Sequence, residues 1–211
     1  MDTIHYIALS MGVAWASGIN LYAAVFMLGY LGSTGNITLP PDLVVVTDPL
    51  VMTAAGLMYC VEFFADKTPG VDTAWDTIHT FIRIPLGAVL AMSAVGDTTP
   101  AVELAAFLVG GSLTAATHAT KTGGRAIINT SPEPISNWTT SIGEDLMVIA
   151  GIWAALVHPW IFVIFLVAFI ILMAWLLPRI WRVLKKLVVR VREFINRNKD
   201  LDAPTLEPPT K

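Results

Sequence analysis

Long apolar stretches alternate with polar segments along most of the chain. A helix needs about 20 predominantly apolar residues to cross the hydrocarbon core of a bilayer. The first and last stretches reach that length outright, and the third and fourth reach it if flanking polar residues contribute. This pattern predicts an all-α, polytopic membrane protein with about six transmembrane or partly re-entrant helices. The six stretches are residues 4–31, 49–61, 78–95, 101–117, 146–157 and 159–177.

The second and fifth stretches are unusually short, with 13 and 12 residues. At 1.5 Å per residue, each reaches only about 20 Å of a hydrocarbon core that is about 30 Å thick. Two interpretations follow. Either polar neighbours such as Glu62 and Asp145 enter the membrane, or these segments are half-helices packed inside the protein.

The chain also contains a weak internal repeat, with halves at about 4–96 and 100–178. Each half reads as a long span, a proline-bearing polar loop, a short span, a polar stretch and a third span. Three spans per half is an odd number, so the halves would enter the membrane from opposite sides, as in the inverted repeats of transporters. A shift of 92 residues, with a few insertions toward the end, aligns Gly18 with Gly110, Leu21 with Leu113, Gly32 with Gly124, Pro40 with Pro132, and Pro85 with Pro178.

Composition supports a membrane location, and charge gives an orientation. Hydrophobic residues make up 55% of the chain and charged residues only 14%, against about 25% charged in soluble domains. Residues 1–178 carry four basic and twelve acidic side chains, whereas residues 179–211 carry nine basic and four acidic ones. Because Lys and Arg near membrane ends favour the cytoplasm, the C-terminus is predicted to be cytoplasmic.

The basic C-terminal region divides into two parts. Residues 179–199 place apolar side chains on one helical stripe and charges on the other side, which predicts a basic amphipathic helix. It would lie on the cytoplasmic surface or extend the sixth span into water. Membrane lipids are its expected partner, rather than nucleic acid, because it directly follows a span. Residues 200–211 contain three prolines and are predicted to be disordered.

The first polar segment covers residues 62–83. Its charged side chains recur at spacings of three and four residues, which places them on one face of a helix. We consider two interpretations: an ion-paired chain within the third span, or an interfacial helix whose charges lie in water. The residues concerned are Glu62, Asp66, Lys67, Asp72, Asp76, His79 and Arg83.

The second polar segment covers residues 118–145. His118, Lys121 and Arg125 put three potential cations on one helical face. Residues 129–137 read as a polar loop, which at membrane depth is tolerated only where protein buries it or water lines it. The acidic pair at positions 144 and 145 has two interpretations, as ligands or as the first turn of the fifth span, which Thr140 or Ser141 would cap.

Ionisable groups inside membrane spans are costly and are therefore functional candidates. His79 and His118 are the natural proton carriers among them. No motif of a hydrolase, metalloprotease or nucleotide-binding loop occurs, and no metal-ligand spacing is found, so we predict no enzyme activity, cofactor or metal. The candidate substrate- or ion-binding residues are Asn20, Glu62, Asp66, Lys67, Asp72, Asp76, His79, Arg83, His118, Lys121, Arg125, Asn129, Ser131, Glu133, Asn137, Glu144 and Asp145.

Three motifs resemble a family of small bacterial integral membrane proteins catalogued as a domain of unknown function. They are Gly18-Ile-Asn-Leu-Tyr, Glu62-Phe-Phe-Ala-Asp-Lys-x-Pro-x-x-Asp72, and Asn129-Thr-Ser-Pro-Glu-Pro-x-Ser-Asn137 followed by Glu144-Asp145. The resemblance covers about residues 5–160. It implies a location in the bacterial inner membrane and brings no activity with it.

The architecture predicts a small transporter or channel for an ion or a small anionic solute. The basic residues would favour an anionic group, and the acidic residues would carry protons or bind a coupling cation, near the membrane midplane. One alternative is a protein that binds or translocates lipid, in which the same cations hold a lipid phosphate. Another is a scaffold, or a homo-oligomer, assembled through the small faces of Gly12, Gly18 and Gly29.

Overall fold

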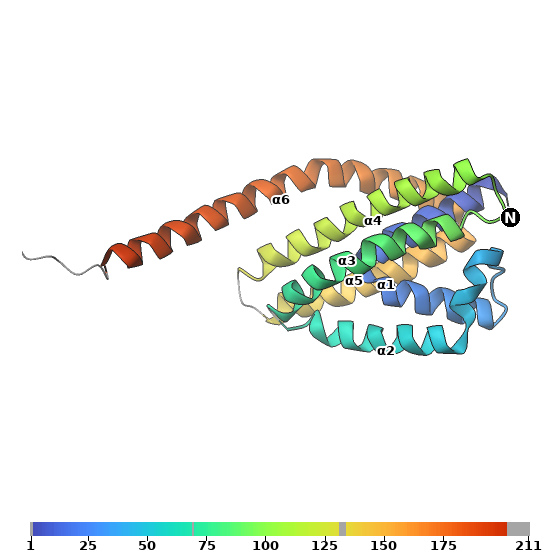
Figure 1. Cartoon of the computed structure of the whole chain (residues 1–211), viewed down its shortest axis with the longest axis horizontal. Coiled ribbons are helices and arrows are strands. Elements are labelled where there is room, and N and C mark those ends of the chain that lie inside the picture. The colour runs from blue at the N-terminus through green and yellow to red at the C-terminus, as the bar shows by residue number, and fades with distance from the viewer. Residues whose placement is uncertain (1, 69, 131–133, 202–211) are drawn as a thin grey trace, which may run out of the picture.

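The chain folds as a bundle of helices, and the computed structural model describes residues 2–68, 70–130 and 134–201. Within these ranges there is no strand, as the all-α prediction requires. The elements are α1 (Thr3–Ser33), the 3-10 helix η1 (Pro41–Thr47), α2 (Pro49–Ala65), α3 (Val71–Ser93), α4 (Pro100–Ile128), α5 (Pro134–Val157) and α6 (Pro159–Leu201) (Figure 1).

Several of these helices have the length and composition of membrane spans. Four of them, α1, α4, α5 and α6, qualify individually. The pair η1 and α2, bent by 65° at its break, makes a fifth if it counts as one span. Helix α3, which carries Asp72, Asp76 and Arg83, is not among them. The chain therefore has several apolar helices, as a membrane protein does, and α3 lies within the bundle although it carries these charges.

The longest apolar stretch does not form one straight span. Asn20 has φ −147° and ψ 95°, which interrupts α1. Before the break, Ser10 binds the carbonyl of Ala91 near the end of α3. After it, the chain runs back along α2, where Gly29 closely approaches Met52. The prediction of an unbroken span over residues 4–31 was wrong, because α1 folds back and its following loop lies at the same end as the N-terminus (Figure 1).

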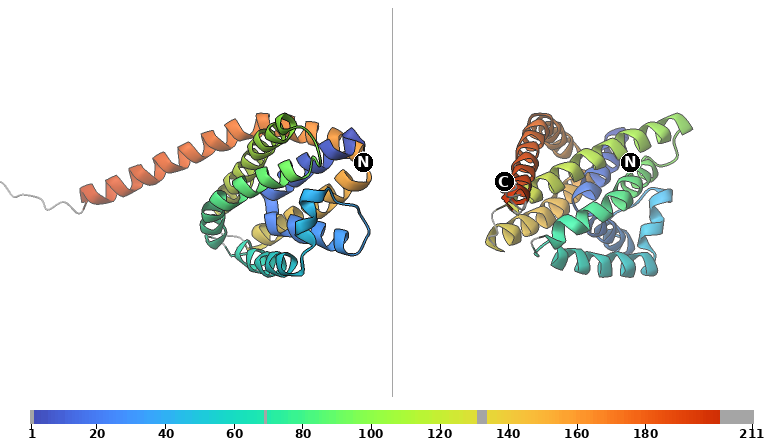
Figure 2. Two further views of the ribbon diagram at one scale, coloured as in Figure 1. Left: turned by 45° about the vertical axis from the view of Figure 1, so that its right-hand side comes forward. Right: turned by 60° about the vertical axis from the view of Figure 1, so that its left-hand side comes forward.

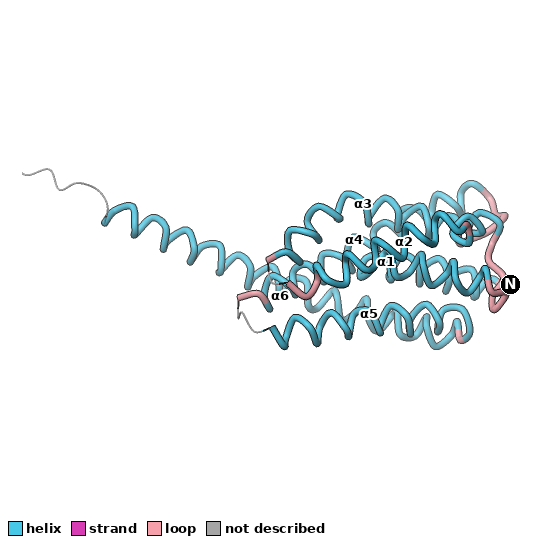
Figure 3. The backbone as a smooth tube through the Cα atoms, turned by 90° about the horizontal axis from the view of Figure 1, so that it is seen from below, coloured by secondary structure: helices cyan, strands magenta, loops and turns pink. Residues whose placement is uncertain are grey.

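The bundle thus has two ends, which we name by their chemistry. The apolar end holds the N-terminus, the α3–α4 turn and the α5–α6 turn. The ionic end holds the α2–α3 turn, the end of α4 and the start of α5. Figure 3 shows the connecting loops gathered at these two ends.

The polar segments are helical, which corrects the predicted lengths and loops. Helix α5 has 24 residues because it begins at Pro134, so the fifth span is not a half-helix. Likewise, α3 begins at Val71 and α4 continues to Ile128. The side chains of Asp76 and Arg83 are fully buried, so the segment over residues 62–83 is not an interfacial helix with its charges in water.

The apolar end is packed around Trp15. Its ring meets the rings of Phe162, Phe165 and Phe169 of α6 edge-on, at centroid distances of 6.2, 5.3 and 5.8 Å. A Cβ atom on Gly151 would overlap the same indole. This small residue therefore lets α1 and α5 approach closely around the aromatic core.

The glycines considered as a docking face are used inside the chain. A Cβ on Gly12 would meet Ala155 of α5, one on Gly18 would meet Thr114 of α4, and one on Gly29 would meet the backbone of η1. They therefore bring neighbouring elements of one chain together, and they do not form an outer face for a partner.

Helix α6 has 43 residues and continues past Pro178 to Leu201 without interruption. Ile180 still packs against Gly123 of α4, and beyond this contact the helix leaves the bundle (Figure 2). The basic segment is therefore an extension of α6. Most of the predicted disordered tail, residues 202–211, lies outside the described residues.

Candidate functional site

The break in α1 creates the centre of the site. The amide of Ala23 would normally bond the carbonyl of Ile19, but it donates instead to Oδ1 of Asn20, at 2.9 Å. Asn20 therefore caps the second half of α1, as helix N-caps do. The released carbonyl of Ile19 accepts hydrogen bonds from Arg83 Nη1 at 3.1 Å and Lys121 Nζ at 3.0 Å. A broken helix thus presents a carbonyl to two cations.

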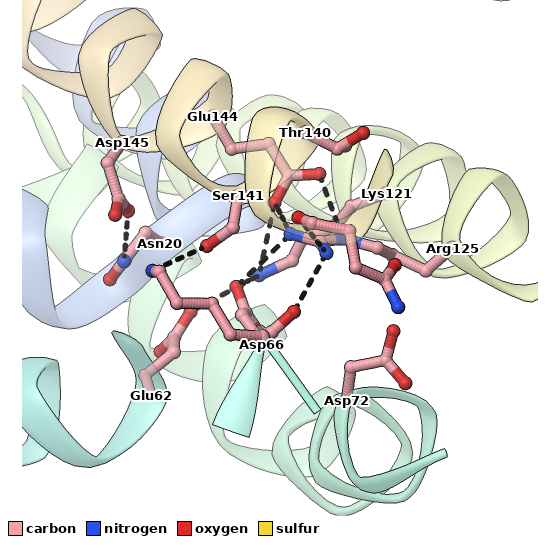
Figure 4. Close-up of polar contacts among 12 residues, drawn as sticks. Asn20, Glu62, Asp66, Asp72, Lys121, Arg125, Thr140, Ser141, Glu144 and Asp145 are labelled. Carbon is pink, nitrogen blue, oxygen red and sulfur yellow. Dashed lines mark hydrogen bonds and ion pairs between the residues drawn. The ribbon is translucent and has the colours of Figure 1, made fainter. Parts of the chain in front are cut away.

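Lys121 is the hub of a buried network of ion pairs. Its Nζ atom lies 2.8 Å from Asp66 Oδ2, 3.3 Å from Glu62 Oε1, 3.6 Å from Asp76 Oδ1 and 3.8 Å from Glu144 Oε2. These carboxylates come from α2, α3, α5 and the turn after α2. One ammonium group therefore links both polar segments (Figure 4).

Two arginines complete the network. Arg83 Nη2 lies 2.5 Å from Glu62, and its Nη1 lies 3.1 Å from Asp76. Arg125 Nη2 lies 2.6 Å from Glu144 and 3.6 Å from Asp66. We call this set the ionic cluster: Glu62, Asp66, Asp76, Arg83, Lys121, Arg125 and Glu144.

The ionic cluster carries more carboxylates than cations. Four acidic and three basic side chains leave a formal charge of −1 when all are ionised. Among the described residues, Glu62 Oε2, Asp66 Oδ1 and Asp76 Oδ2 have no hydrogen-bond partner. A buried unsatisfied acceptor is costly, so the cluster has both the charge and the open oxygens to take up one proton or one small cation.

The histidines occupy two different environments. His118 Nδ1 lies 3.4 Å from Arg83 Nη1 and therefore accepts, because a guanidinium can only donate. Its Nε2 lies 3.2 Å from the carbonyl of Asp76 and so carries the proton, which makes His118 a neutral imidazole. His79 instead stacks on Trp75 at 4.1 Å and binds that residue's carbonyl at 2.9 Å.

Asn20 ties the fifth helix to the break. Its Nδ2 donates to Asp145 Oδ1 at 2.9 Å, and Tyr59 donates to Asp145 Oδ2 at 3.3 Å. Both Glu144 and Asp145 lie three turns inside α5, so their interpretation as first-turn capping residues was wrong. Ser141 likewise caps nothing at that position, and its hydroxyl accepts a hydrogen bond from Lys67, at 3.2 Å.

The remaining predicted site residues lie nearer the ionic end. Asn129 Nδ2 donates to both oxygens of Asp72, at 2.8 and 2.9 Å. Asn137 Nδ2 donates to Asn129 Oδ1 at 2.9 Å. Two further candidates, Ser131 and Glu133, lie outside the described residues. These contacts join α3 to the end of α4 and the first turn of α5. They border the ionic cluster through Arg125, whose Nη1 donates to the carbonyl of Asn137.

Sequence reasoning missed some participants. Thr80 lies 2.8 Å from His118 Nε2 and one helical turn after Asp76, so extending the polar stripe of α3 would have found it. Tyr59 and the carbonyl of Ile19 left no such signal, because both occur in apolar stretches. Within the described part of the chain, no three acidic, histidine or cysteine side chains are grouped to hold a metal ion. The four carboxylates face the cations of the cluster instead.

The chain belongs to the family described as Domain of unknown function (DUF4126), whose model matches residues 7–179. This confirms the resemblance to a family of unknown function. Neither the curated proteins nor the solved structures contain a match to the chain.

Proposed function

We propose that this DUF4126 protein is a small membrane transporter that moves an ion or a small solute and is coupled to protons. One observation carries the proposal. The two polar segments, residues 62–83 and 118–145, meet in a single buried ionic cluster around the break in α1. Broken helices that present backbone groups to buried charges are typical of ion and substrate sites in transporters.

The cluster favours a proton or a cation over an anion as its first ligand. Each of its cations already faces at least two carboxylates, so an anion would have to displace one of them. A proton or a small cation would bring the formal charge of the cluster from −1 to zero. An anionic solute is then expected to bind only after protonation releases Lys121 or Arg125.

An inverted repeat is part of the proposal and has three supports. Helices α2 and α5 run in opposite directions through the bundle, and so do α3 and α6 (Figure 1). The corresponding prolines, Pro85 and Pro178, both lie inside the third helix of their half. The corresponding glycines both lie at close helix contacts. Gly18 of α1 packs against α4, and Gly110 of α4 packs against α3. The first helices do not follow this relation: α1 up to its break and α4 both start at the apolar end and run in the same direction (Figure 1). The expectation that the two halves enter from opposite sides is therefore wrong for their first helices, and the inversion is proposed for the second and third helices only.

The proposed location is the bacterial inner membrane, with the ionic end and the C-terminus in the cytoplasm. The excess of basic residues after Pro178 supports this orientation. The exposed basic extension of α6 would then lie close to anionic lipid headgroups.

Purified protein in liposomes tests transport directly. A pH-sensitive dye inside the vesicles would report proton uptake driven by an imposed pH gradient, with panels of monovalent cations and small anions added outside. We expect gradient-dependent uptake that Asp76→Asn abolishes, because the amide can no longer exchange a proton. Arg182→Ala, on the exposed part of α6, is the control and should transport normally.

Two further outcomes would decide the proposal. Arg125→Ala should change how strongly proton uptake depends on the added solute more than it changes the rate of uptake without solute. Absence of flux for every ion and solute, in vesicles where the protein is folded and correctly inserted, would contradict transport.

A further inference from the structure

A cavity of about 160 Å³ lies beside the ionic cluster, between α1, α4, α5 and α6. Along α4 it extends from Thr117 to Ile128, which is about 16 Å at the rise of an α-helix. Ile128 is the last residue of α4, so the cavity runs from the interior toward the ionic end of the bundle. Lys121, Arg125 and Glu144 line it.

Glu144 is the carboxylate of the cluster most open to this cavity. Its side chain is 13% exposed, whereas the side chains of Glu62 and Asp76 are 0% exposed. Neither Glu62 nor Asp76 is among the residues that line the cavity. A proton that reaches the cluster through this space would therefore meet Glu144 first.

The cavity wall is mostly apolar but includes several polar groups that can bind water. Thr117 Oγ1, which is buried, has no hydrogen-bond partner among the described residues. Together with Lys121 on the same helix and Thr140 and Glu144 on α5, it offers donors and acceptors in a space large enough for several water molecules. A dry cavity would leave the Thr117 hydroxyl unsatisfied.

We infer that this cavity is a hydrated pathway by which Glu144 exchanges protons with the aqueous phase at the ionic end. The inference rests on the proposed proton coupling and names its loading residue. A proton from water forms an O–H bond on the carboxylate of Glu144, which removes one negative charge and weakens the ion pair with Arg125. Arg125 keeps its contacts to Asp66 Oδ2 at 3.6 Å and to the carbonyl of Asp66 at 2.9 Å, so it is not left unpaired.

Lys121 connects this event to the rest of the cluster. Its Nζ lies between Glu144, at 3.8 Å, and Asp66 and Glu62, at 2.8 and 3.3 Å. Neutral Glu144 no longer attracts the ammonium, which then pairs more fully with the carboxylates of α2 and the turn after it. Protonation at the cavity is thereby coupled to the buried carboxylates around the break in α1.

Cysteine labelling tests whether the cavity holds water, independently of transport. Cys60 is the only cysteine of the chain, so Cys60→Ser gives a thiol-free background. In it, Thr120→Cys places a thiol on the cavity wall, and Ala119→Cys places one on the outward, exposed face one residue away. A charged methanethiosulfonate reagent reacts with the thiolate, which forms only where water reaches.

We expect Thr120→Cys to react at least tenfold faster than Ala119→Cys in membranes. Equal, slow rates at both positions would show a dry cavity and overturn the inference. Reaction of Thr120→Cys with an apolar maleimide but not with the charged reagent would show that lipid fills the space. That outcome would also overturn the inference and would favour the lipid-handling alternative.

Filling the cavity tests its role in proton movement. Gly124 lines the cavity, and a Cβ there would meet no atom within 4 Å. Gly124→Leu should therefore fold, occupy the space and slow proton uptake in liposomes at least fivefold. Gly143→Leu is the matched control, because Gly143 is an exposed helical glycine with the same free surroundings outside the cavity, and it should leave uptake unchanged.

Glu144→Gln gives the final criterion. The amide preserves the shape of the side chain but cannot take up a proton, so uptake should fall as far as in Asp76→Asn. Normal uptake by Glu144→Gln or Gly124→Leu would overturn the pathway while leaving transport itself intact. Absence of uptake in the unaltered protein, together with fast labelling of Thr120→Cys, would instead contradict the proposed function and leave the hydrated cavity standing.

Discussion

At the apolar end of the bundle, Trp15 is enclosed by three phenylalanine rings of α6. At the ionic end, Lys121 is enclosed by four carboxylates. Both residues are buried, and both fix α1 or α4 against its neighbours. The first arrangement needs no precise geometry beyond close packing, whereas the second needs every charge to find a partner.

The two ends therefore differ in how far packing alone explains them. Apolar side chains of similar volume often replace a buried ion-pair network without loss of stability, because removing ions from water costs as much as their attraction returns. Packing alone therefore explains the apolar end but not the ionic one. The excess carboxylate and the open oxygens of the buried cluster are the features from which we propose exchange of protons or ions.

The largest expected loss of stability comes from removing the Arg83 guanidinium from the ionic cluster. Arg83→Met leaves Glu62 and Asp76 buried beside only one remaining cation, Lys121, and we expect a loss of about 3–5 kcal/mol. Thermal unfolding in detergent, followed by tryptophan fluorescence, measures the loss. Adding Glu62→Gln to Arg83→Met should recover part of it, and a double variant less stable than Arg83→Met would contradict the charge argument.

A comparable loss of stability is expected from removing the Trp15 ring at the apolar end. Trp15→Ala removes the centre of the aromatic core and should destabilise the protein by about 3 kcal/mol. Proton uptake per folded molecule should nevertheless persist, since the ionic cluster is untouched. Trp160→Ala, at a residue of α6 that is 67% exposed, is the control. Loss of uptake in Trp15→Ala at temperatures where it remains folded would show that the two ends are not independent.

The smallest of these effects is expected at the break in α1, which lies between the two ends. Asn20→Ala removes the cap of the second half-helix and the donor to Asp145, and should cost about 1–2 kcal/mol. Asn20→Ser should recover the cap but not the contact to Asp145. Its stability should therefore lie between that of Asn20→Ala and that of the unaltered protein. Asn36→Ala, at an exposed loop residue, should stay close to the original stability. Equal stability of Asn20→Ala and Asn36→Ala would exclude the capping role.

Much of the architecture could be predicted from the order of apolar and polar residues. The stretch at 159–177 identified α6, and the spacing of Asp72, Asp76 and Arg83 placed these side chains on one face of α3. Their burial was one of two alternatives that spacing cannot separate, because an interfacial helix shows the same periodicity. Contact with α4, which supplies Lys121 and His118, decided between them.

Other features had no local signal. Residues 4–31 read as a continuous span, yet α1 breaks at Asn20. The Asn20 side chain replaces the helical bond of Ala23, and Arg83 and Lys121 donate hydrogen bonds to the freed carbonyl of Ile19. Of the two interpretations of the short fifth stretch, the half-helix was wrong, because α5 begins at Pro134 and includes the polar residues before Leu146. Asn137, Ser141, Glu144 and Asp145 make hydrogen bonds to other polar groups of the protein.

Membrane residence and the segments that carry the charges follow from the amino-acid order alone, because hydropathy and spacing are local properties of the chain. That those charges meet, that α1 folds back and that a cavity lies beside Glu144 follow only from how the helices pack. These features depend on which distant residues become neighbours. In a low-dielectric interior, a charge is stable only where the fold supplies its partners.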